Sequence, residues 1–435
     1  GKVTIRQSTA SKELHLGTGL SSATIGKVNA ATLEVGRSDG GNLVFDSDIT
    51  TSAGTVHLKS DQQVIGVVGG VSAENLAITA GGGATISDDN FDFTTLALDV
   101  GGDSLINSTS ADWNLGTVDG LTGLTIQSGR SADVVLNAQG TLGLNSTINF
   151  GGGFSALRAK AGDGFAAASA SVSGQSLATV EFGLDGSGRT FAVGGTSAIL
   201  SGAALARFNG VHQMRVAAAN HTVEVGGFSV NVVDRAQIDA GQLQQLGAMN
   251  VTGGSLHLDV AEGGLQLDHA VTAAQTVSLN DAAGDGIGGT GVISATALAL
   301  RSSGDVALAS STHQVGSIAA DVGNLAFNNG RTLVVDSLDG LSGITASGTV
   351  DLRALGATSD LVLNAAVTAG NDGGATTAAL LAAGRNFVNN AGAGAVTVDS
   401  GRWLVYSTSP LADTRGGLGP DFKQYDAGLA STVLG

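Results

Sequence analysis

Short segments in which apolar and other residues alternate recur along most of the chain. The clearest sets are Leu256–Leu258, Val277–Leu279 and Leu298–Leu300, which start about 21 residues apart, and Val56–Leu58, Leu76–Ile78 and Leu96–Leu98, which start about 20 residues apart. An alternation with a period of two is typical of β-strands, because successive side chains of a strand point to opposite faces. The pattern therefore predicts many short strands at a repeat of about 20 residues.

The length of the repeat favours one way of burying such short strands. Hairpin sandwiches and solenoids both contain short strands separated by turns. A repeat of about 20 residues suits a coil of three strands, and stacked coils build parallel sheets around a packed interior. The predicted fold is an all-β, right-handed parallel β-helix (a β-solenoid). With roughly 20 coils and about 4.8 Å between strands, it would form an elongated rod on the order of 100 Å long.

The regularity of the repeat varies along the chain. Residues 33–150 and 250–365 repeat well, whereas residues 151–250 are rich in Ala and Gly and repeat poorly. We expect this middle section to be irregular or to bear an insertion, with wider coils or a protruding loop near Gly151–Ser171. The best match to a helical period, Ala236–Met249, also lies there.

The C-terminal end differs from the rest in its aromatic content. Aromatic residues make up only 4% of the chain, yet Trp403 and Tyr406 lie within four positions of each other. The open end of a solenoid exposes unpaired strand edges and core, so these two residues are predicted to cap the stack. Contact with a partner is the alternative. We therefore expect a shaft over residues 1–398 and a cap and junction segment over residues 399–435.

Composition and charge narrow the range of functions. The chain has 435 residues, 42% of them hydrophobic and 13% charged, with 68 Gly and no Cys. This composition excludes simple disorder. The net charge of −17 argues against nucleic acid as a partner, because phosphate binding requires clustered Lys and Arg. No apolar run approaches the roughly 18 residues of a membrane span. The absence of a signal peptide before Gly1 is interpreted as the mark of an excised or processed fragment.

Two further patterns match functional motifs in part. The glycines Gly284, Gly286 and Gly289 have the spacing of a dinucleotide fingerprint, but strands rather than a helix follow them, which favours a coil corner. The acidic run Asp88–Asp92 could offer oxygen ligands to Ca²⁺. It lacks the glycine-aspartate repeat of calcium-binding β-rolls, which favours a solvated loop. We therefore predict no cofactor.

Enzymatic chemistry has one set of candidate residues. Asp99, Asp103 and Asp112 could act as the carboxylates of a polysaccharide-cleaving enzyme. That chemistry needs two carboxyl groups about 5 to 9.5 Å apart in a groove, where aromatic side chains usually hold the sugar rings. The chain has only 2 Trp and 2 Tyr. The prediction is that it is not an enzyme.

Histidine and asparagine residues raise two smaller questions. His57 and His257 lie in the middle of apolar units and are expected to face outward from the core, and no metal-ligand spacing is present. Asn-x-Ser/Thr sequons, which are either glycosylation sites or chance matches, begin at Asn107, Asn145, Asn220 and Asn250. Asn107 and Asn145 could instead point inward and form hydrogen-bonded ladders along the coils.

Two stretches of the chain resemble a known family. The first runs from about Asp281 to Ala354 and contains DAAGDGIGGTG, VISATALALRSSGDVAL and HQVGSIAADVGNLAFNNGRTLVVD. It resembles the β-helical shafts of filamentous haemagglutinin-like exoproteins of two-partner secretion systems. The second combines SGRWLVYS, from Ser400, with Asp413, GGL from Gly416 and FKQY from Phe422. It is similar to the segment that ends the helix in such proteins, before tandem small domains of the MBG or YDG type.

The resemblance implies a secreted adhesin, located outside the cell or on the surface of a Gram-negative bacterium. Cell adhesion, virulence or biofilm formation would be its setting. The implied partners are the outer-membrane transporter of the secretion system and a host-cell or matrix receptor, and the chain is expected to be a monomeric rod without a membrane span. The expected function is that of a structural shaft that displays binding regions away from the cell. Two alternatives are a β-helix that itself binds glycan or protein, and a polysaccharide-acting enzyme.

Overall fold

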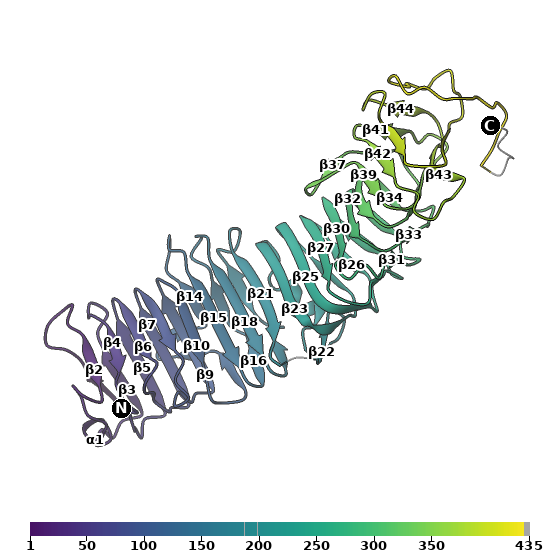
Figure 1. Cartoon of the computed structure of the whole chain (residues 1–435). Coiled ribbons are helices and arrows are strands. Elements are labelled where there is room, and N and C mark those ends of the chain that lie inside the picture. The colour runs from purple at the N-terminus through teal and green to yellow at the C-terminus, as the bar shows by residue number, and fades with distance from the viewer. Residues whose placement is uncertain (187, 198, 430–435) are drawn as a thin grey trace. The chain divides into compact units, whose positions relative to one another are not determined.

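The computed structural model describes residues 1–186, 188–197 and 199–429. Its strands wind into a parallel β-solenoid of about 16 turns, which confirms the predicted fold class (Figure 1). The turns are fewer than expected because several coils are longer than the repeat seen in the sequence. The widest of them separates Thr179 from its partner Gln213. By their internal contacts, residues 1–218 and 230–234 form one compact unit, and residues 219–229 and 235–435 form a second.

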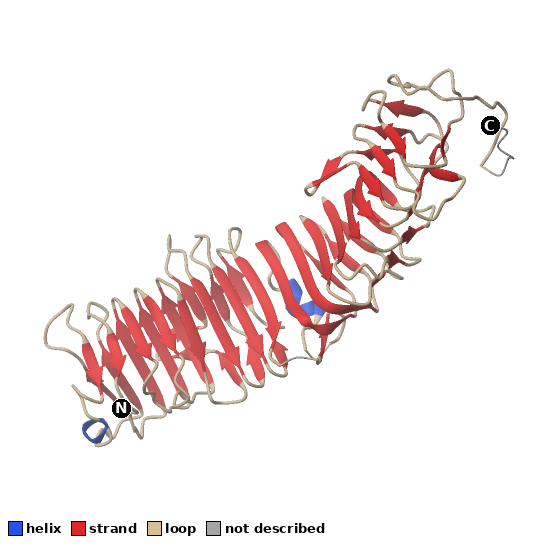
Figure 2. Cartoon of the chain, in the orientation of Figure 1, coloured by secondary structure: helices blue, strands red, loops and turns tan. Residues whose placement is uncertain are grey.

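The first unit contains two long parallel ladders, drawn as red arrows in Figure 2. The strands of one are β1 (Lys2–Ile5), β3 (Thr32–Gly36), β5 (Thr55–Ser60), β7 (Asn75–Ala80), β9 (Thr95–Val100), β11 (Trp113–Leu115), β14 (Leu124–Ile126), β16 (Thr141–Gly143), β17 (Thr147–Asn149), β19 (Gly164–Ala166) and β20 (Ser171–Ser173). Those of the other are β2 (Leu14–Leu16), β4 (Leu43–Phe45), β6 (Gln63–Gly66), β8 (Gly83–Ile86), β10 (Ser104–Asn107), β15 (Asp133–Ala138), β18 (Ala156–Ala161) and β21 (Thr179–Leu184), with β22 (Thr190–Val193) after it.

The second unit repeats the arrangement with three strands in most coils. Its strands are β26 (Met249–Val251), β27 (Ser255–Val260), β28 (Leu265–Gln266), β29 (Val271–Ala273), β30 (Thr276–Asp281), β31 (Ile287–Gly288), β32 (Ile293–Ser302), β33 (Val306–Leu308), β34 (Gln314–Val322), β35 (Leu325–Asn329), β36 (Leu333–Val335), β39 (Ile344–Ala346), β40 (Val350–Ala354), β41 (Leu361–Leu363), β42 (Val367–Ala369), β43 (Thr377–Ala383), β44 (Phe387–Asn389), β45 (Val396–Val398) and β46 (Arg402–Tyr406). The strands β23 (Val211–Val225), β24 (Phe228–Val230) and β25 (Val232–Gln245) belong to the segments where the chain passes between units.

The core consists of columns of equivalent strand positions. In the ladder of β3, β5, β7 and β9, the step from one partner to the next is nearly constant and matches the repeat of the sequence. The same register places Leu33, Val56, Leu76 and Leu96 in one buried column, and Val35, Leu58, Ile78 and Leu98 in the next. Branched aliphatic residues fill such columns well because each side chain packs on its counterpart one coil away. The sequence repeat is thus the repeat of the coil.

The middle section contains a wider coil, as expected, but not near residues 151–171. Residues 151–171 contain no long insertion: β18 follows β15 in regular register, with Ala156 beside Asp133, and the wider coil comes only after Thr179. That coil holds α2 (Gly202–Ala206), which is, with α1 (Ser22–Ile25), one of the two short helices among the described residues, both blue in Figure 2. The helical period of Ala236–Met249 was misleading. Most of this segment is strand β25, because parallel pairing with β27 outweighs a local periodicity.

The C-terminal end of the second unit is built on β46. This strand pairs with β43 and sets Trp403 beside Ala379 and Tyr406 beside Ala382. Residues 407–429 contain no regular strand, but Thr414 forms a parallel bridge with Val388. Within the described part of the chain, neither short helix has the length or apolar character to cross a bilayer.

Candidate functional site

Two β-hairpins leave the solenoid wall at equivalent places. The first outer hairpin is β12 (Thr117–Val118) with β13 (Leu121–Thr122), and the second is β37 (Ser337–Leu338) with β38 (Leu341–Ser342). Each lies between two strands that pair with the first and second half of one strand in the preceding coil. For the first hairpin these are β11 and β14 on β9, and for the second they are β36 and β39 on β34. The hairpins therefore interrupt the ladder at the same register.

The two hairpins share their sequence and their turn. TVDGLTGLT from Thr117 matches SLDGLSGIT from Ser337, with identical or closely similar side chains at every position. The tip residues Asp119 and Gly120 have φ of 46° and 88°, and Asp339 and Gly340 have φ of 48° and 79°. Positive φ at both central residues defines the type I′ turn, for which Asp-Gly is a preferred pair. The sequence therefore builds one tight hairpin twice.

Each hairpin covers the outer face of three coils. The outward residue at the centre of the strand is buried in each of these coils, whereas most outward residues elsewhere in the same strands are at least partly accessible. Under the first hairpin these residues are His57, Ala77 and Ala97, which are 3%, 0% and 0% exposed, and under the second they are Ser278, Ala299 and Ala319, at 4%, 0% and 0%. Small side chains let the hairpin lie flat. Val118, with Leu121 against it, packs on Ala77 and Ala97 in a small apolar cluster outside the solenoid core.

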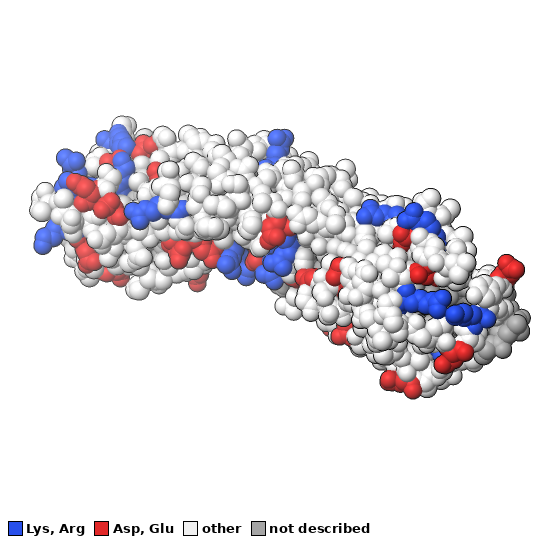
Figure 3. Space-filling view, turned by 90° about the horizontal axis from the view of Figure 1, so that it is seen from above, with Lys and Arg blue, Asp and Glu red and all other residues white. Residues whose placement is uncertain are grey.

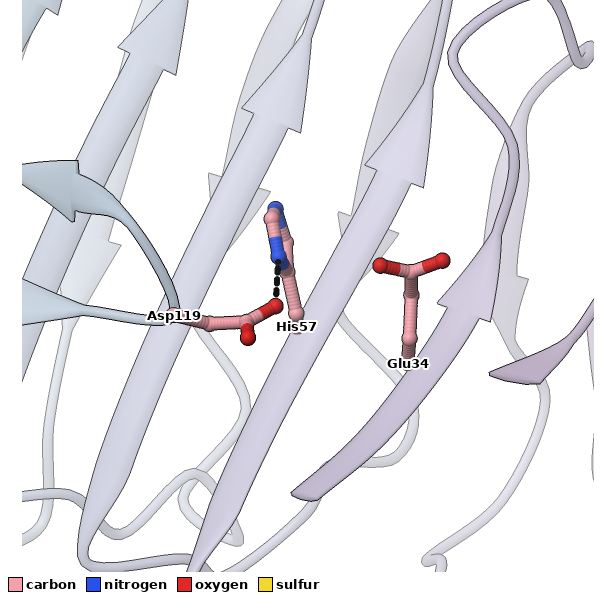
Figure 4. A group of neighbouring side chains, drawn as sticks. All are labelled: Glu34, His57 and Asp119. Atoms are coloured by element: carbon pink, nitrogen blue, oxygen red, sulfur yellow. Dashed lines mark hydrogen bonds and ion pairs between the residues drawn. The ribbon is translucent and has the colours of Figure 1, made fainter. Parts of the chain in front are cut away.

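The tip of the first hairpin anchors a polar cluster. The Asp119 carboxylate contacts His57 Nδ1 at 2.7 Å and accepts a hydrogen bond from Lys2 Nζ at 2.7 Å. The other imidazole nitrogen, Nε2, lies 3.0 Å from Thr79 Oγ1. Glu34, one coil before His57, binds both Lys2 and Lys59. Figure 4 shows Asp119 on its hairpin and Glu34 on the adjacent strand, with His57 between them.

Burial and charge together set the protonation of this cluster. Burial lowers the pKa of His57, although its hydrogen bond with Asp119 opposes the shift. Burial would raise the pKa of Asp119, but the hydrogen bonds from Lys2 and His57 hold it below its usual value. The pKa of Glu34 is also lowered, because Lys2 and Lys59 outweigh its desolvation. When His57 is neutral, the positive charges of Lys2 and Lys59 equal the negative charges of Glu34 and Asp119.

The cluster also contains a set of metal-ligand types. Single ligand atoms of Glu34, His57 and Asp119 lie within 4.8 Å of one another, and a nitrogen with two oxygens could bind zinc. Lys2 Nζ, however, lies 2.8 Å from Glu34 Oε2, and Lys59 Nζ lies 2.7 Å from the same oxygen. A divalent cation would have to displace ammonium groups that already neutralise its ligands. The geometry fits an ion-pair network that fastens the hairpin.

The second hairpin is fastened with simpler chemistry. The Asp339 carboxylate accepts hydrogen bonds from Ser278 Oγ at 2.7 Å and Arg301 Nη1 at 2.9 Å. Burial would raise the pKa of Asp339, but these two donors hold it below its usual value. Ser278 occupies the position of His57, and Arg301 that of Thr79, in the coils before the hairpin. The aspartate at the tip is thus kept while its partners differ.

Two of the three acidic candidates bind backbone groups of the next coil. Asp103 Oδ1 accepts the backbone N–H of Asp133 at 2.8 Å, and Asp112 Oδ1 accepts that of Thr141 at 2.6 Å. Asp99 lies on β9 and has one buried oxygen, Oδ1, without a hydrogen-bond partner among the described residues. Two of the three carboxylates thus orient backbone of the next coil.

The glycine motif and the acidic run lie at coil corners. The N–H groups of Gly284 and Gly286 donate to the Asp281 carboxylate, in a turn that leads into strand β31. Within Asp88–Asp92, Asp88 binds Asn90, and Phe91 is buried against Phe45. The glycine motif therefore lies at a coil corner and the acidic run lies in a loop, as the sequence favoured.

The four sequon asparagines are held differently. Asn107 forms a ladder with Asn137, whose Nδ2 donates to Asn107 Oδ1 at 2.8 Å. Asn145 accepts from the backbone N–H of Ser169 at 3.0 Å. The predicted ladder contacts exist, but the inward direction was wrong, because Asn107 is only half-buried and Asn145 is exposed. Asn220 is exposed, and the half-buried Asn250 donates from Nδ2 to Ser229 Oγ.

Sequence reasoning missed the outer hairpins and their anchors. His57 does face away from the core, as predicted, but it is buried because the hairpin covers it. The recurrence of DGLTG at Asp119 and DGLSG at Asp339 was a signal that could have located both hairpins. Asp-Gly between apolar residues is a strong hairpin indication.

No protein-family model matches the chain, and searches of curated proteins and of solved structures find no significant match either.

Proposed function

We propose that this chain is a structural shaft segment of a large secreted bacterial surface adhesin, which displays binding regions away from the cell. The observation that carries the proposal is parallel pairing in which the strands inside each ladder have a partner on both sides. β5 pairs with β3 and β7, β7 pairs with β9, and β30 pairs with β27 and β32. Stacked coils of this kind gain length with each repeat while their cross-section stays constant.

The outer hairpins are suited to a shaft that is under mechanical tension. Each hairpin connects its own coil to the third coil before it. Apolar side chains of the hairpin pack on the outer face, and the aspartate at the tip binds a side chain of that third coil. These side-chain contacts connect the coils in addition to the backbone hydrogen bonds of the ladder. A shaft benefits from ties that resist the separation of adjacent coils.

The charge distribution on the surface is compatible with an extracellular protein. Charged side chains are scattered in small groups of both signs on the face seen in Figure 3, and most of that face is neutral. The acidic balance of the sequence, with 37 acidic and 20 basic residues, favours solubility. Secretion by a two-partner system, with its outer-membrane transporter as a partner, belongs to this proposal and is supported by the resemblance of the sequence.

A change in the number of coils tests the shaft function. Residues 133–155 form one coil, because Asp133 pairs with Ala156. The chain is attached to a surface by its N-terminus and carries a fluorophore at its C-terminus, whose height is measured by distance-dependent quenching. Four added copies of this coil should raise the fluorophore by about 19 Å at about 4.8 Å per strand. Four added copies of residues 133–143, about half a coil, are the control and should disrupt the fold.

Two results would contradict the proposal. The first is an unchanged height after insertion of folded coils. The second is cleavage of a polysaccharide by the chain, which would support the enzyme alternative. The engagement of Asp103 and Asp112 with backbone N–H groups favours the shaft over that alternative.

A further inference from the structure

The rare aromatic residues of the chain gather at one pocket in the second unit. The chain contains 2 Tyr and 2 Trp, and both tyrosines and one tryptophan line this pocket of about 320 Å³. They are Trp403, Tyr406 and Tyr425, joined by Phe422. Ligand pockets of small molecules begin at about this volume. An aromatic set of this kind is unusual in a chain with so few aromatic residues.

Closure of the core does not account for all these aromatic residues. The backbone of Thr414 pairs with β44, and Leu418 is only 8% exposed, so the segment that precedes Phe422 and Tyr425 already packs on this end. Tyr425, in contrast, is 63% exposed. A side chain that served to seal the core would be buried. The exposed ring is available to a ligand.

The charges at the pocket differ from those of the whole chain. Arg402, Arg415 and Lys423 line it, together with Asp413 and Asp421. Asp413 is engaged, because its carboxylate accepts from Ser407 Oγ at 2.6 Å and from the N–H of Phe387 at 2.8 Å. Arg415 and Lys423 have no side-chain hydrogen bond or ion pair with any residue that the structure describes. Asp421 likewise has no such contact among the described residues, so the pocket offers two uncommitted cations against one uncommitted carboxylate in a chain of net charge −17.

We propose that this pocket binds an acidic oligosaccharide, such as a chain of uronic acid units. Flat aromatic faces suit the apolar C–H face of a pyranose ring, and the Trp403 N–H and the tyrosine hydroxyls can bond its hydroxyl groups. Arg415 and Lys423 supply the charge that a sugar carboxylate requires. The pocket adds a glycan-binding role to the shaft, and its failure would leave the shaft proposal unchanged.

The experiment uses the full chain and two matched sugars. Oligogalacturonate is titrated in parallel with the fully methyl-esterified form of the same length, which keeps the rings but removes the charge. Tryptophan fluorescence provides the signal, because Trp113 is 2% exposed and Trp403 lies in the pocket. Binding of the acidic form should be at least tenfold tighter than that of the ester. Tyr425→Ala and Lys423→Gln should each weaken it at least fivefold.

The controls separate this site from general effects. Leu411→Ala changes a residue that is 91% exposed and does not line the pocket, and Lys12→Gln removes an exposed lysine of the first unit. Both should bind like the unchanged chain. Equal affinity for acid and ester, an absence of binding by either, or equal competition by a polyglutamate peptide would each overturn the proposal.

Discussion

The two outer hairpins are built on the same plan but fastened by different groups. Both place an Asp-Gly tip over three coils, and both join their strands by a hydroxyl pair, Thr117 with Thr122 at 3.1 Å and Ser337 with Ser342 at 3.0 Å. The first tip meets a buried histidine and a lysine. The second meets a serine and an arginine.

This difference shows which features the hairpin requires. Both hairpins have the same turn, two buried alanines beneath them and a carboxylate at the tip, so we infer that the hairpin requires these three features. The donors that meet the carboxylate vary, because several side chains can supply a hydrogen bond from the coil below. The first site is also more enclosed: the Asp119 side chain is 17% exposed and that of Asp339 is 33%. We expect the first hairpin to depend more strongly on its anchor.

The largest effect is expected where the hairpin rejoins the wall. Gly123 and Gly343 have φ of 65° and 71°, and an added Cβ would lie 1.9 Å from Thr147 O and 2.2 Å from Ala366 O. Gly123→Ala and Gly343→Ala should therefore each lower the free energy of unfolding by roughly 3 kcal/mol or more. Urea unfolding followed by circular dichroism measures the loss.

The tip glycine is the matched control for this prediction. Gly120 also has positive φ, at 88°, but an added Cβ there meets no atom within 4 Å. Gly120→Ala should cost only about 1 kcal/mol from backbone strain. Equal losses at Gly120 and Gly123 would show that contact with the next coil is not the cause.

Substitution of the two tip aspartates should destabilise the two hairpins to different extents. Asp119→Ala leaves the buried His57 and the ammonium of Lys2 without their shared partner, so we expect a loss of roughly 1 to 3 kcal/mol in unfolding free energy. Asp339→Ala removes bonds from Ser278 and Arg301 at a more exposed place, and its loss should be at most about 1 kcal/mol. Amide hydrogen exchange at Val118 and Leu338 reports opening of each hairpin. A greater opening of the second hairpin would reverse the comparison.

The sequence predicted the coils but not what covers them. The repeat is visible because the columns that contain Val56 and Leu256 need an apolar residue in every coil. The outer cluster has no such periodicity, because Glu34, His57 and Asp119 come from different coils and meet only after folding. The helical pattern near Ile238 failed for a related reason. Its strand conformation is set by its partner in the next coil, Leu258.

A pH change should give the smallest effect and should act on the first hairpin. Burial lowers the pKa of His57 below its ordinary value of 6.5, so the unfolded chain binds a proton more readily than the folded one. The stabilisation from neutral His57 is complete above pH 6.5 and is lost as the pH falls through its folded pKa. Lys59 opposes protonation, whereas Glu34 and Asp119 favour it, so the net loss should be about 1 kcal/mol or less.

Hydrogen exchange isolates this effect from other titrations, since burial also lowers the pKa of His313 in the second unit. Protection of the Val118 and Leu121 amides, corrected for intrinsic rates, should decrease between pH 7 and pH 5. In a chain that carries His257→Gln, which removes the histidine that interacts electrostatically with Asp339, protection of Leu338 and Leu341 should stay constant, because Ser278 and Arg301 hold the pKa of Asp339 below its usual value. His57→Gln keeps a hydrogen-bond donor for Asp119 and should abolish the pH dependence of the first hairpin. A persistent dependence in that variant would assign the titration to a group other than His57.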